Sequence, residues 1–312
     1  MDIEILLFLQ NIRNSLGGIL NEFFSFITNV SVDYYIILIP LIIYWTSDKK
    51  KGLFIYLCHG LSCILNAVLK SAFCVYRPWI RDSRVKPLDT VIAGASGFSF
   101  PSGHTTSSSS VYLPIIKLYK KRKLTIFCII MITLTMFSRM FVGVHTPQDV
   151  IVGLLIGLVS TYIVSIVSDY IDKNPDKDTL VLIIATIFTV LVLLYVGLKS
   201  YPIDYVDGKI LVDPDSMKIN SFKDPGTFFG VVVAWYLERR YFNFDISGST
   251  ENKVIRAIIG ALLVVAYYSI VVNAVGKLIN INIVYFLLRA SIPIVFIVLY
   301  PLTWTRRNKK AK

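Results

Sequence analysis

Long apolar runs separated by short charged clusters dominate this sequence of 312 residues. Most runs are about 18 to 22 residues long, and a helix of that length crosses the roughly 30 Å hydrocarbon core of a bilayer. Hydrophobic residues make up 55% of the chain, a share that would leave a soluble domain with too much apolar surface in water. The pattern therefore predicts an all-α integral membrane protein, a polytopic helical bundle in which the charged clusters form loops.

The apolar runs predict about nine transmembrane helices. They are expected at 33–47, 52–71, 103–119, 124–142, 148–168, 179–198, 226–244, 254–275 and 280–304. Residues 1–32 are also apolar, but Glu4, Arg13 and Glu22 interrupt them. An interfacial helical segment is therefore favoured over a tenth span.

We expect a single integral-membrane domain with three parts. Residues 1–32 form the interfacial segment, and residues 33–168 form a core that carries the functional motifs. Residues 169–312 add further transmembrane helices and a basic cytoplasmic tail.

The net charge of +12 is arranged as a topology signal and not as a patch for nucleic acid. Threading the chain through nine spans places most basic clusters on one side, which the positive-inside rule makes cytoplasmic. These clusters are Lys49–Lys51, KLYKKRK (117–123), Lys173 with Lys177, Arg239, Arg240, Lys253 and Arg256, and the C-terminal TRRNKKAK (305–312). We therefore expect a cytoplasmic C-terminus and the bilayer, not nucleic acid, as the partner of these residues.

The same threading brings three polar motifs together on the opposite, external face. In the first, LKSAFCVYRP, Lys70 and Arg77 are seven residues apart, and Pro78 is expected to stop the helix. Seven residues make two helical turns, so both cations are expected to point the same way. The alternative is that both side chains only extend to the interface.

The second motif, FPSGHTTSSSS, contains a Pro-Ser-Gly turn that leads into a predicted span. The backbone N–H groups of Ser102, Gly103 and His104 would be the free donors of a helix N-terminus, which binds phosphate readily. Gly103 would let an anion approach the backbone closely. The alternative is an ordinary Ser-capped helix start.

The third motif, SRMFVGVHTPQD, combines a helix start with ionisable side chains. Thr146, Pro147 and Asp149 fit an N-cap, a first-turn proline and a third-position acid. His145 would then stand just outside the helix, with Asp149 binding one imidazole nitrogen and the other free to attack. Arg139 adds a planar fork suited to phosphate oxygens. A structural histidine is the alternative.

The three motifs together predict a phosphate cradle. Lys70, Arg77 and Arg139 supply positive charge, while the two histidines supply a nucleophile and a proton donor. Phosphoryl transfer depends mainly on positioning and charge stabilisation, which fixed cations can provide. We therefore expect neither a metal ion nor another cofactor.

These motifs resemble a known three-part signature. Lys70-x6-Arg77-Pro78, Pro101-Ser102-Gly103-His104 and Ser138-Arg139-x5-His145-x3-Asp149 are similar to the signature of the type-2 phosphatidic acid phosphatase superfamily. That superfamily comprises membrane lipid phosphate phosphatases and is related to glucose-6-phosphatase and vanadium haloperoxidases. The resemblance covers about residues 52–168.

The resemblance implies a role for each matching residue. His145 would attack phosphorus and become a phosphohistidine, with Asp149 orienting it. His104 would protonate the leaving oxygen and later activate water. The phosphate would be held by Lys70, Arg77, Ser102, Gly103 and Arg139.

The implied activity is hydrolysis of a lipid or isoprenoid phosphate or pyrophosphate at the extracytoplasmic face of a plasma membrane, with a bacterial one as the default. Phosphatidic acid, phosphatidylglycerol phosphate, undecaprenyl pyrophosphate and sphingoid phosphates all fit. Three alternatives stay open: a phosphotransferase with the same intermediate, a phosphatase of a soluble sugar phosphate, and a transporter that binds the headgroup without cleaving it.

Four further basic residues are candidate headgroup contacts. Arg81, Arg84 and Lys86 follow the first motif, where attraction to anionic lipid is the alternative role. Arg289 lies within the last predicted span, where a structural pair with an acid on another helix is the alternative.

Two other segments carry structural expectations. The external stretch 201–226 is expected to be a long loop, with Asp207-Gly208 turning a small hairpin and a lid as the alternative to a plain surface loop. Gly153-x3-Gly157 predicts close packing between helices.

Overall fold

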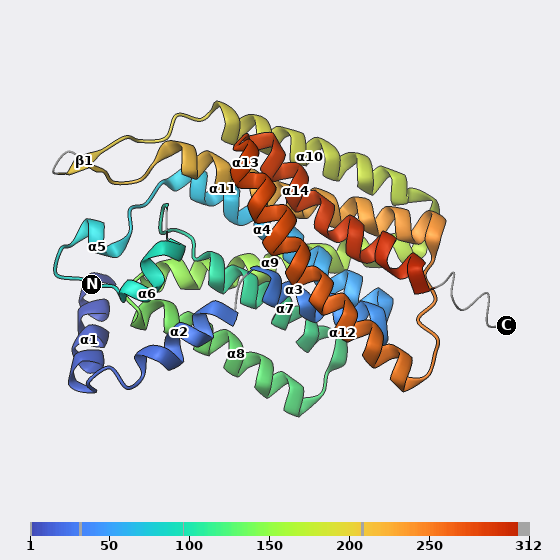
Figure 1. The fold of residues 1–312 in the computed structure, drawn as a ribbon, viewed down its shortest axis with the longest axis horizontal. Helices are drawn as coiled ribbons and strands as arrows, with labels where there is room; N and C mark the ends of the chain where they lie inside the picture. The colour runs from blue at the N-terminus through green and yellow to red at the C-terminus, as the bar shows by residue number, and fades with distance from the viewer. Residues whose placement is uncertain (1, 31–32, 96, 207–208, 305–312) are drawn as a thin grey trace.

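The computed structural model is an α-helical bundle, described for residues 2–30, 33–95, 97–206 and 209–304 (Figure 1). Its first part contains α1 (Asp2–Ser15), α2 (Asn21–Val30), α3 (Asp33–Thr46), α4 (Lys49–Phe73), α5 (Pro78–Arg81), α6 (Asp89–Ile92), η1 (Ala93–Ala95), α7 (Gly103–Tyr119), α8 (Arg122–Phe141) and α9 (Pro147–Lys173). Its second part contains η2 (Pro175–Lys177), α10 (Asp178–Leu198), β1 (Tyr205–Val206), β2 (Lys209–Ile210), α11 (Pro214–Leu237), η3 (Glu238–Phe242), α12 (Thr250–Ala266), η4 (Tyr267–Val275), α13 (Gly276–Ile279), α14 (Asn282–Pro293) and η5 (Ile294–Leu299).

All nine predicted runs are helical, but the count of nine membrane spans is not confirmed. Within the described ranges, six helices are long and apolar enough to cross a bilayer, or seven if the bent pair α2 and α3 is counted as one broken span. The helices α3 and α7 have only 14 and 17 residues. The first half of α11 is interrupted by polar and charged residues, among them Lys218, Lys223 and Asp224.

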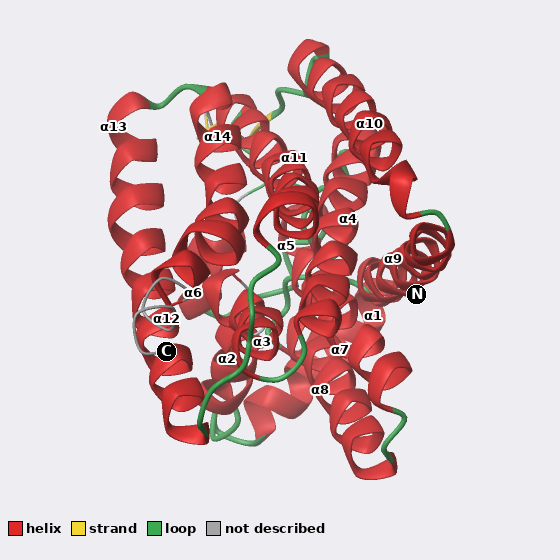
Figure 2. Cartoon of the chain, turned by 90° about the vertical axis from the view of Figure 1, so that its right-hand side faces the viewer, coloured by secondary structure: helices red, strands yellow, loops and turns green. Residues whose placement is uncertain are grey.

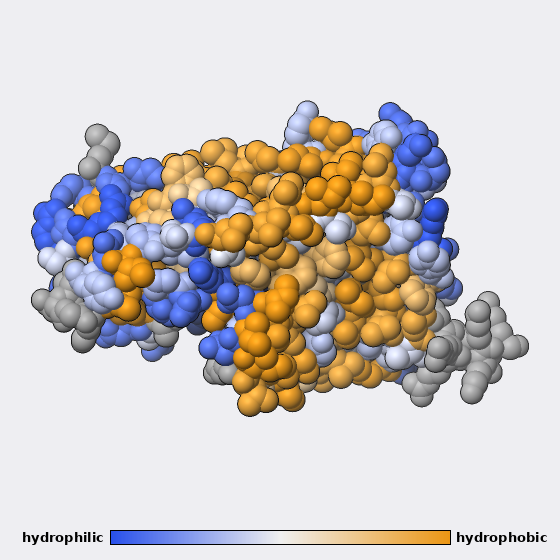
Figure 3. Space-filling view, turned by 90° about the horizontal axis from the view of Figure 1, so that it is seen from above, coloured by the Kyte–Doolittle hydropathy of each residue, from blue (hydrophilic) through white to orange (hydrophobic). Residues whose placement is uncertain are grey.

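An apolar belt surrounds the bundle between two polar ends, and Figure 3 shows it on one face. Large apolar side chains are exposed on its outer helices, for example Leu155, Leu191 and Leu262, which are 49%, 59% and 66% exposed. Such a surface is unfavourable in water and is matched by lipid tails. The chain is therefore an integral membrane protein.

The helix α4 lies inside the bundle and organises the elements around it. It packs against α3, α7, α9 and α11 (Figures 1 and 2). The C-terminal ends of α4 and α8 and the N-terminal ends of α7 and α9 meet at the left-hand end of Figure 1. The three predicted motifs are therefore brought together, because each lies at one of these helix ends.

The end of α4 corrects the expected relation between Lys70 and Arg77. The helix stops at Phe73, and Cys74 follows in the left-handed conformation with φ 46°. Pro78 therefore begins the short α5 instead of terminating α4. Arg77 lies in the connection between the two helices, so helical spacing does not explain why it reaches the same site as Lys70.

The stretch 201–226 is also corrected, because half of it is helical. Asp213 caps α11 by accepting hydrogen bonds from the backbone N–H groups of Asp215 and Ser216, so the helix begins at Pro214. The expected small hairpin is present, with Tyr205 paired to Ile210. Asp207-Gly208 and the basic tail 305–312 lie outside the described residues.

The N-terminal segment folds as two helices, α1 and α2, at the same end as the three motifs. Figure 1 shows α1 running across the end of the bundle. Phe8 and Ile19 on this segment are 64% and 81% exposed. Placement of the segment in the membrane interface stays a prediction.

The predicted close packing at Gly153 and Gly157 is confirmed. A Cβ added at Gly153 would lie 2.9 Å from the carbonyl oxygen of Ser102, and one added at Gly157 would lie 2.6 Å from the Cβ of Ser109. These contacts join α9 to α7. The two helices that present their N-termini to the site are thus held at a fixed distance.

A Gly157→Val substitution is expected to separate α7 from α9. The added side chain must displace the backbone of α7 near Ser109, a kind of overpacking that costs about 1 to 3 kcal/mol. The detergent-purified variant should show a lower melting temperature than the unmodified protein. Leu158→Val, on the exposed side of the same helix, is the control and should melt within a degree or two of the parent, as expected for a change of about 0.5 kcal/mol or less. An unchanged melting temperature for Gly157→Val would contradict the tight contact.

Candidate active site

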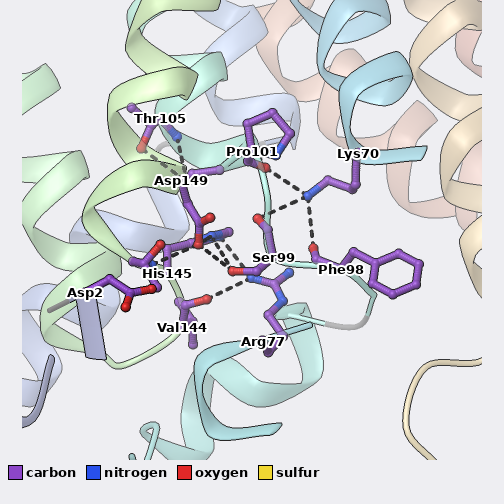
Figure 4. Close-up of polar contacts among 12 residues, drawn as sticks. Asp2, Lys70, Arg77, Phe98, Ser99, Pro101, Thr105, Val144, His145 and Asp149 are labelled. Carbon is purple, nitrogen blue, oxygen red and sulfur yellow. Dashed lines mark hydrogen bonds and ion pairs between the residues drawn. The ribbon is translucent and has the colours of Figure 1, made fainter. Parts of the chain in front are cut away.

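The side chain of His145 lies between a cation and a carboxylate (Figure 4). Its Nδ1 is 3.3 Å from the Oδ2 of Asp149, and its Nε2 is 2.9 Å from the Nη1 of Arg77. A guanidinium nitrogen can only donate, so Nε2 accepts and carries an unshared electron pair. The Nδ1 therefore bears the proton and faces the carboxylate. This is the tautomer that the sequence predicts for an attacking imidazole.

Asp149 is held by the helix that it caps. Its Oδ2 accepts a hydrogen bond of 2.8 Å from the backbone N–H of Thr146, so the expected first turn of α9 is confirmed. The same oxygen accepts from the hydroxyl of Ser99. Ser99 is 1% exposed and also lies 3.4 Å from the Nδ1 of His145. Sequence reasoning missed Ser99, because a serine two residues before Pro101 gives no signal of where its side chain points.

Burial keeps the His145 imidazole neutral. The side chain is 2% exposed, and it lies in the turn between α8 and α9. This burial, together with the charge of Arg77, holds the pKa of His145 well below its usual value of 6.5, although Asp149 acts in the opposite direction. The neutral form, which carries the reactive electron pair, therefore predominates at neutral pH.

Lys70 and Arg77 both donate to backbone carbonyls around the site. The Nζ of Lys70 donates to the carbonyl oxygens of Phe98 and Pro101 at 3.0 and 2.9 Å. Arg77 donates to the carbonyl oxygens of Gly97 and Val144 at 3.0 and 3.1 Å. Lys70 thus ties α4 to the connection before α7, and Arg77 ties that connection to the turn that carries His145.

The N-terminus of α7 supplies fewer free donors than expected. Ser102 caps the helix, but its own backbone N–H donates to the carbonyl oxygen of Asp149 at 3.0 Å. This pairing follows from the close approach of α7 and α9. At Gly103 an added Cβ would meet nothing within 4 Å, so there is open space beside the backbone where an anion would approach. Of the three backbone N–H groups that the sequence predicts as free donors, only those of Gly103 and His104 are therefore expected to be available to an anion.

Arg139 and His104 complete the cluster. Arg139 is 1% exposed, and its Nε has no hydrogen-bond partner within the described residues. A buried guanidinium with an unpaired donor is costly, and it is suited to an anionic ligand. His104, at the start of α7, is half-buried and lies within electrostatic range of Arg139 and His145.

The candidate headgroup contacts do not join this cluster. Arg81 forms an ion pair with Asp2 at 2.8 Å, and Arg84 forms one with Glu4 at 3.0 Å. Arg289 lies on α14 with its guanidinium 4.9 Å from the ring centre of Tyr268. Lys86 has an exposed side chain, and its backbone pairs with α1.

Arg13 supports the turn that carries His145, a role that the sequence did not indicate. It is 6% exposed and donates to the carbonyl oxygens of Phe141 and Lys86 at 3.2 and 2.5 Å. It thereby links α1 to the end of α8 and to the connection after α5. From the sequence it was only a charge that interrupts an apolar run.

Two family matches cover most of the chain. Residues 51–173 match the PAP2 superfamily, and residues 222–312 match the transmembrane extension of PAP2 superfamily phosphatases. The second match lies in a region where the sequence offered no motif. Together they account for both the motif-bearing core and the C-terminal helices.

Curated relatives and one solved structure are also similar. Phosphatidylglycerophosphatase B from Bacillus subtilis is 31% identical over 174 residues, which are 51% of this chain and 80% of that protein. Undecaprenyl-diphosphatase BcrC from Bacillus subtilis is 26% identical over 51% of this chain and 81% of that protein. A solved phosphatidylglycerolphosphate phosphatase from Bacillus subtilis has a TM-score of 0.44 and 28% identity, covering 55% of this chain and 85% of that one.

The titration of His145 provides a direct test of the electrostatic arrangement. In protein with isotope-labelled histidines, the NMR signal of His145 is followed from pH 8 downward. It should remain that of a neutral imidazole to a pH below about 6.5, the usual pKa of histidine. Arg77→Gln removes one of the causes of the lowered pKa, so the midpoint should move to higher pH. The chain has only three histidines, so single substitutions assign each signal. Arg81→Gln, which removes a charge that His145 does not contact, is the control; an equal shift in both variants would refute the specific role of Arg77.

Proposed function

Because this chain belongs to the PAP2 superfamily, we propose that it is a metal-independent phosphatase of a membrane lipid or isoprenoid phosphate that works through a phosphohistidine at the extracytoplasmic face. The curated relatives are phosphatases, and this chain is a phosphoric ester hydrolase of the lipid phosphate kind. The proposed phosphohistidine mechanism rests on the arrangement of the groups around His145.

The position of the His145 Nε2 is the observation that carries the proposal. Its electron pair points at Arg77, while Nδ1–H faces Asp149. Phosphate oxygens are stronger acceptors than backbone carbonyls, so a substrate phosphate would draw the Arg77 guanidinium onto itself and bring phosphorus to Nε2. Attack forms a nitrogen–phosphorus bond and breaks the bond between phosphorus and the lipid oxygen. Asp149 stabilises the positive charge that develops on the imidazole.

His104 is assigned the proton transfers. In the first step it gives a proton to the leaving lipid oxygen, which departs as an alcohol or, from a pyrophosphate, as a monophosphate. In the second step it takes a proton from a water molecule that attacks phosphorus. The nitrogen–phosphorus bond then breaks, inorganic phosphate is released, and His145 returns to its neutral form.

The remaining residues are assigned to the phosphate oxygens. Lys70, Arg77 and Arg139 neutralise the charge that spreads over these oxygens in the transition state. Two observations support this assignment: the Nε of Arg139 has no hydrogen-bond partner in the described part of the chain, and there is open space beside Gly103. Ser102 contributes by capping α7 and positioning its first turn, because its own N–H is already paired.

The place of the site supports the proposed substrate class. The motifs lie at one end of the apolar belt, where a headgroup phosphate could reach the protein while its tail stays in lipid. The names of the relatives include both a phosphatidylglycerophosphatase and undecaprenyl-diphosphatases, so a lipid phosphate and an isoprenoid pyrophosphate are the two substrate types to compare first.

Phosphate release in EDTA tests the chemistry. Purified protein should release phosphate from phosphatidylglycerol phosphate, phosphatidic acid or undecaprenyl pyrophosphate, and His145→Ala should lower the rate by at least about 10³-fold because the nucleophile is lost. Rapid quenching with radiolabelled substrate should trap an acid-labile, base-stable phosphoenzyme that His145→Ala lacks. Loss of activity in EDTA, or a phosphoenzyme that persists in His145→Ala, would contradict the mechanism.

A leaving-group comparison in the same assay isolates His104. His104→Ala should slow cleavage of a lipid phosphate by about 10² to 10³-fold, because an alkoxide needs a proton. The initial burst of p-nitrophenol from p-nitrophenyl phosphate should stay within about tenfold of that of the unmodified protein, because this leaving group departs unprotonated. Adding glucose 6-phosphate and an alcohol acceptor to the panel separates the soluble-substrate phosphatase and the phosphotransferase from the main proposal.

Cysteine labelling tests the proposed face. In a background without native cysteines, Ser83→Cys lies in the connection after α5, at the end of the bundle that carries the motifs, and Lys120→Cys follows α7 at the opposite, basic end; both positions are exposed. An impermeant maleimide should label Ser83→Cys in intact cells and Lys120→Cys only after permeabilisation. The reverse result would place the site on the cytoplasmic side.

A further inference from the structure

A large cavity lies at the end of the bundle opposite His145. It has a volume of about 600 Å³, within the range of ligand pockets, and it is lined by residues of α4, α9, α10 and α11. Its mouth is at the N-terminal end of α4, whereas Lys70 is near the C-terminal end. Lys51 and Lys70 are roughly 28 Å apart along this helix at 1.5 Å per residue. The cavity is therefore distinct from the catalytic cluster.

The inner walls of the cavity are apolar. Leu57 and Leu61 contribute from α4, Phe188 from α10, and Phe228 and Val232 from α11. The helices α9 and α10 that flank it face lipid on their outer sides, as the exposed Leu155 and Leu191 show. A groove of this kind at a lipid-facing surface matches a hydrocarbon chain.

The mouth of the cavity carries excess positive charge. It is lined by five basic and three acidic residues: Lys49, Lys50, Lys51, Lys117 and Arg239, and Asp169, Asp172 and Glu238. Two of the cations are close to carboxylates, since Lys49 is 3.0 Å from Glu238 and Lys51 is 3.2 Å from Asp48.

The other three basic side chains at the mouth have only long ion-pair distances or none among the described residues. Lys50 and Arg239 share Asp172, each at 4.0 Å, which is the limit of an ion pair. The side chain of Lys117 is exposed, and no carboxylate of the described residues lies within ion-pair distance of it. Three basic groups at one opening are therefore available to an anion.

We propose that this cavity binds one anionic phospholipid from the leaflet at the basic end of the protein. An acyl chain occupies the apolar groove, and the headgroup phosphate lies between Lys50, Lys117 and Arg239. A soluble anion would gain nothing from the apolar walls, and a lipid without net charge would gain little from the cations. The site does not depend on the phosphatase activity, and an anionic diester such as phosphatidylglycerol offers no phosphate monoester to cleave.

Lipid titration followed by native mass spectrometry tests this site. Delipidated protein in detergent should bind one phosphatidylglycerol molecule at least tenfold more tightly than phosphatidylcholine with the same chains. Combining Lys50→Gln, Lys117→Gln and Arg239→Gln should weaken phosphatidylglycerol binding by about fivefold for each charge removed. The matched control combines Lys120→Gln, Lys121→Gln and Lys123→Gln, which remove the same charge at the same end but outside the cavity.

A variant inside the groove tests the second half of the proposal. Ala185 lines the cavity, and Ala185→Phe should fill it and reduce binding of phosphatidylglycerol by at least tenfold. Phosphate release by each variant checks folding, because none of these residues belongs to the catalytic cluster. Equal affinity for the two lipids, an equal loss in the control combination, or unchanged binding in a folded Ala185→Phe protein would each overturn the proposal. If Ala185→Phe does not fold, the two charge combinations decide the question.

Discussion

The Asp149 carboxylate is the interaction on which the site depends. It caps the first turn of α9 through the N–H of Thr146, faces the Nδ1 of His145 and accepts from Ser99. A buried carboxylate is costly unless its oxygens are hydrogen-bonded, and here one oxygen serves three partners. The same group therefore starts a membrane helix, fixes the imidazole tautomer and fastens the connection before α7. The start of α9 and the orientation of His145 therefore depend on the same carboxylate.

Around this carboxylate the site is strongly positive. Arg77 and Arg139 are buried at 6% and 1% exposure, with Lys70 nearby, and like charges held this closely oppose folding. The backbone carbonyl partners of Lys70 and Arg77 reduce this cost only in part, and the Nε of Arg139 has no hydrogen-bond partner among the described residues. A site that binds a phosphate must carry this cost, because its cations have to be in place before the substrate arrives.

Much of this arrangement was predictable from the sequence, and the failures have physical causes. Apolar runs predict the helices, and capping residues predict where α9 begins, because both features depend on residues close together in the sequence. The prediction that Arg77 lies on the same helix as Lys70 was wrong. The helix α4 already ends at Phe73, and no glycine or proline at that point indicates its end. Ser99 and Arg13 were missed because their roles depend on contacts between segments that are far apart in the chain. The count of nine spans is not confirmed where helices are short or begin with charged turns, as in α7 and α11.

The three motifs are supported both by a tight helix contact and by segments outside the motif-bearing core. The residues of the candidate site lie at helix ends or in the connections beside them, and the Gly153 and Gly157 contacts fix the distance between α7 and α9. The elements that surround this geometry are α1, held by Arg13, and the connection between α10 and α11, which reaches the same end of the bundle (Figure 1). Neither lies within the family match at 51–173. The motif-bearing core is therefore held partly by segments outside that match, as the hydrogen bonds from Arg13 to the carbonyl oxygens of Phe141 and Lys86 show.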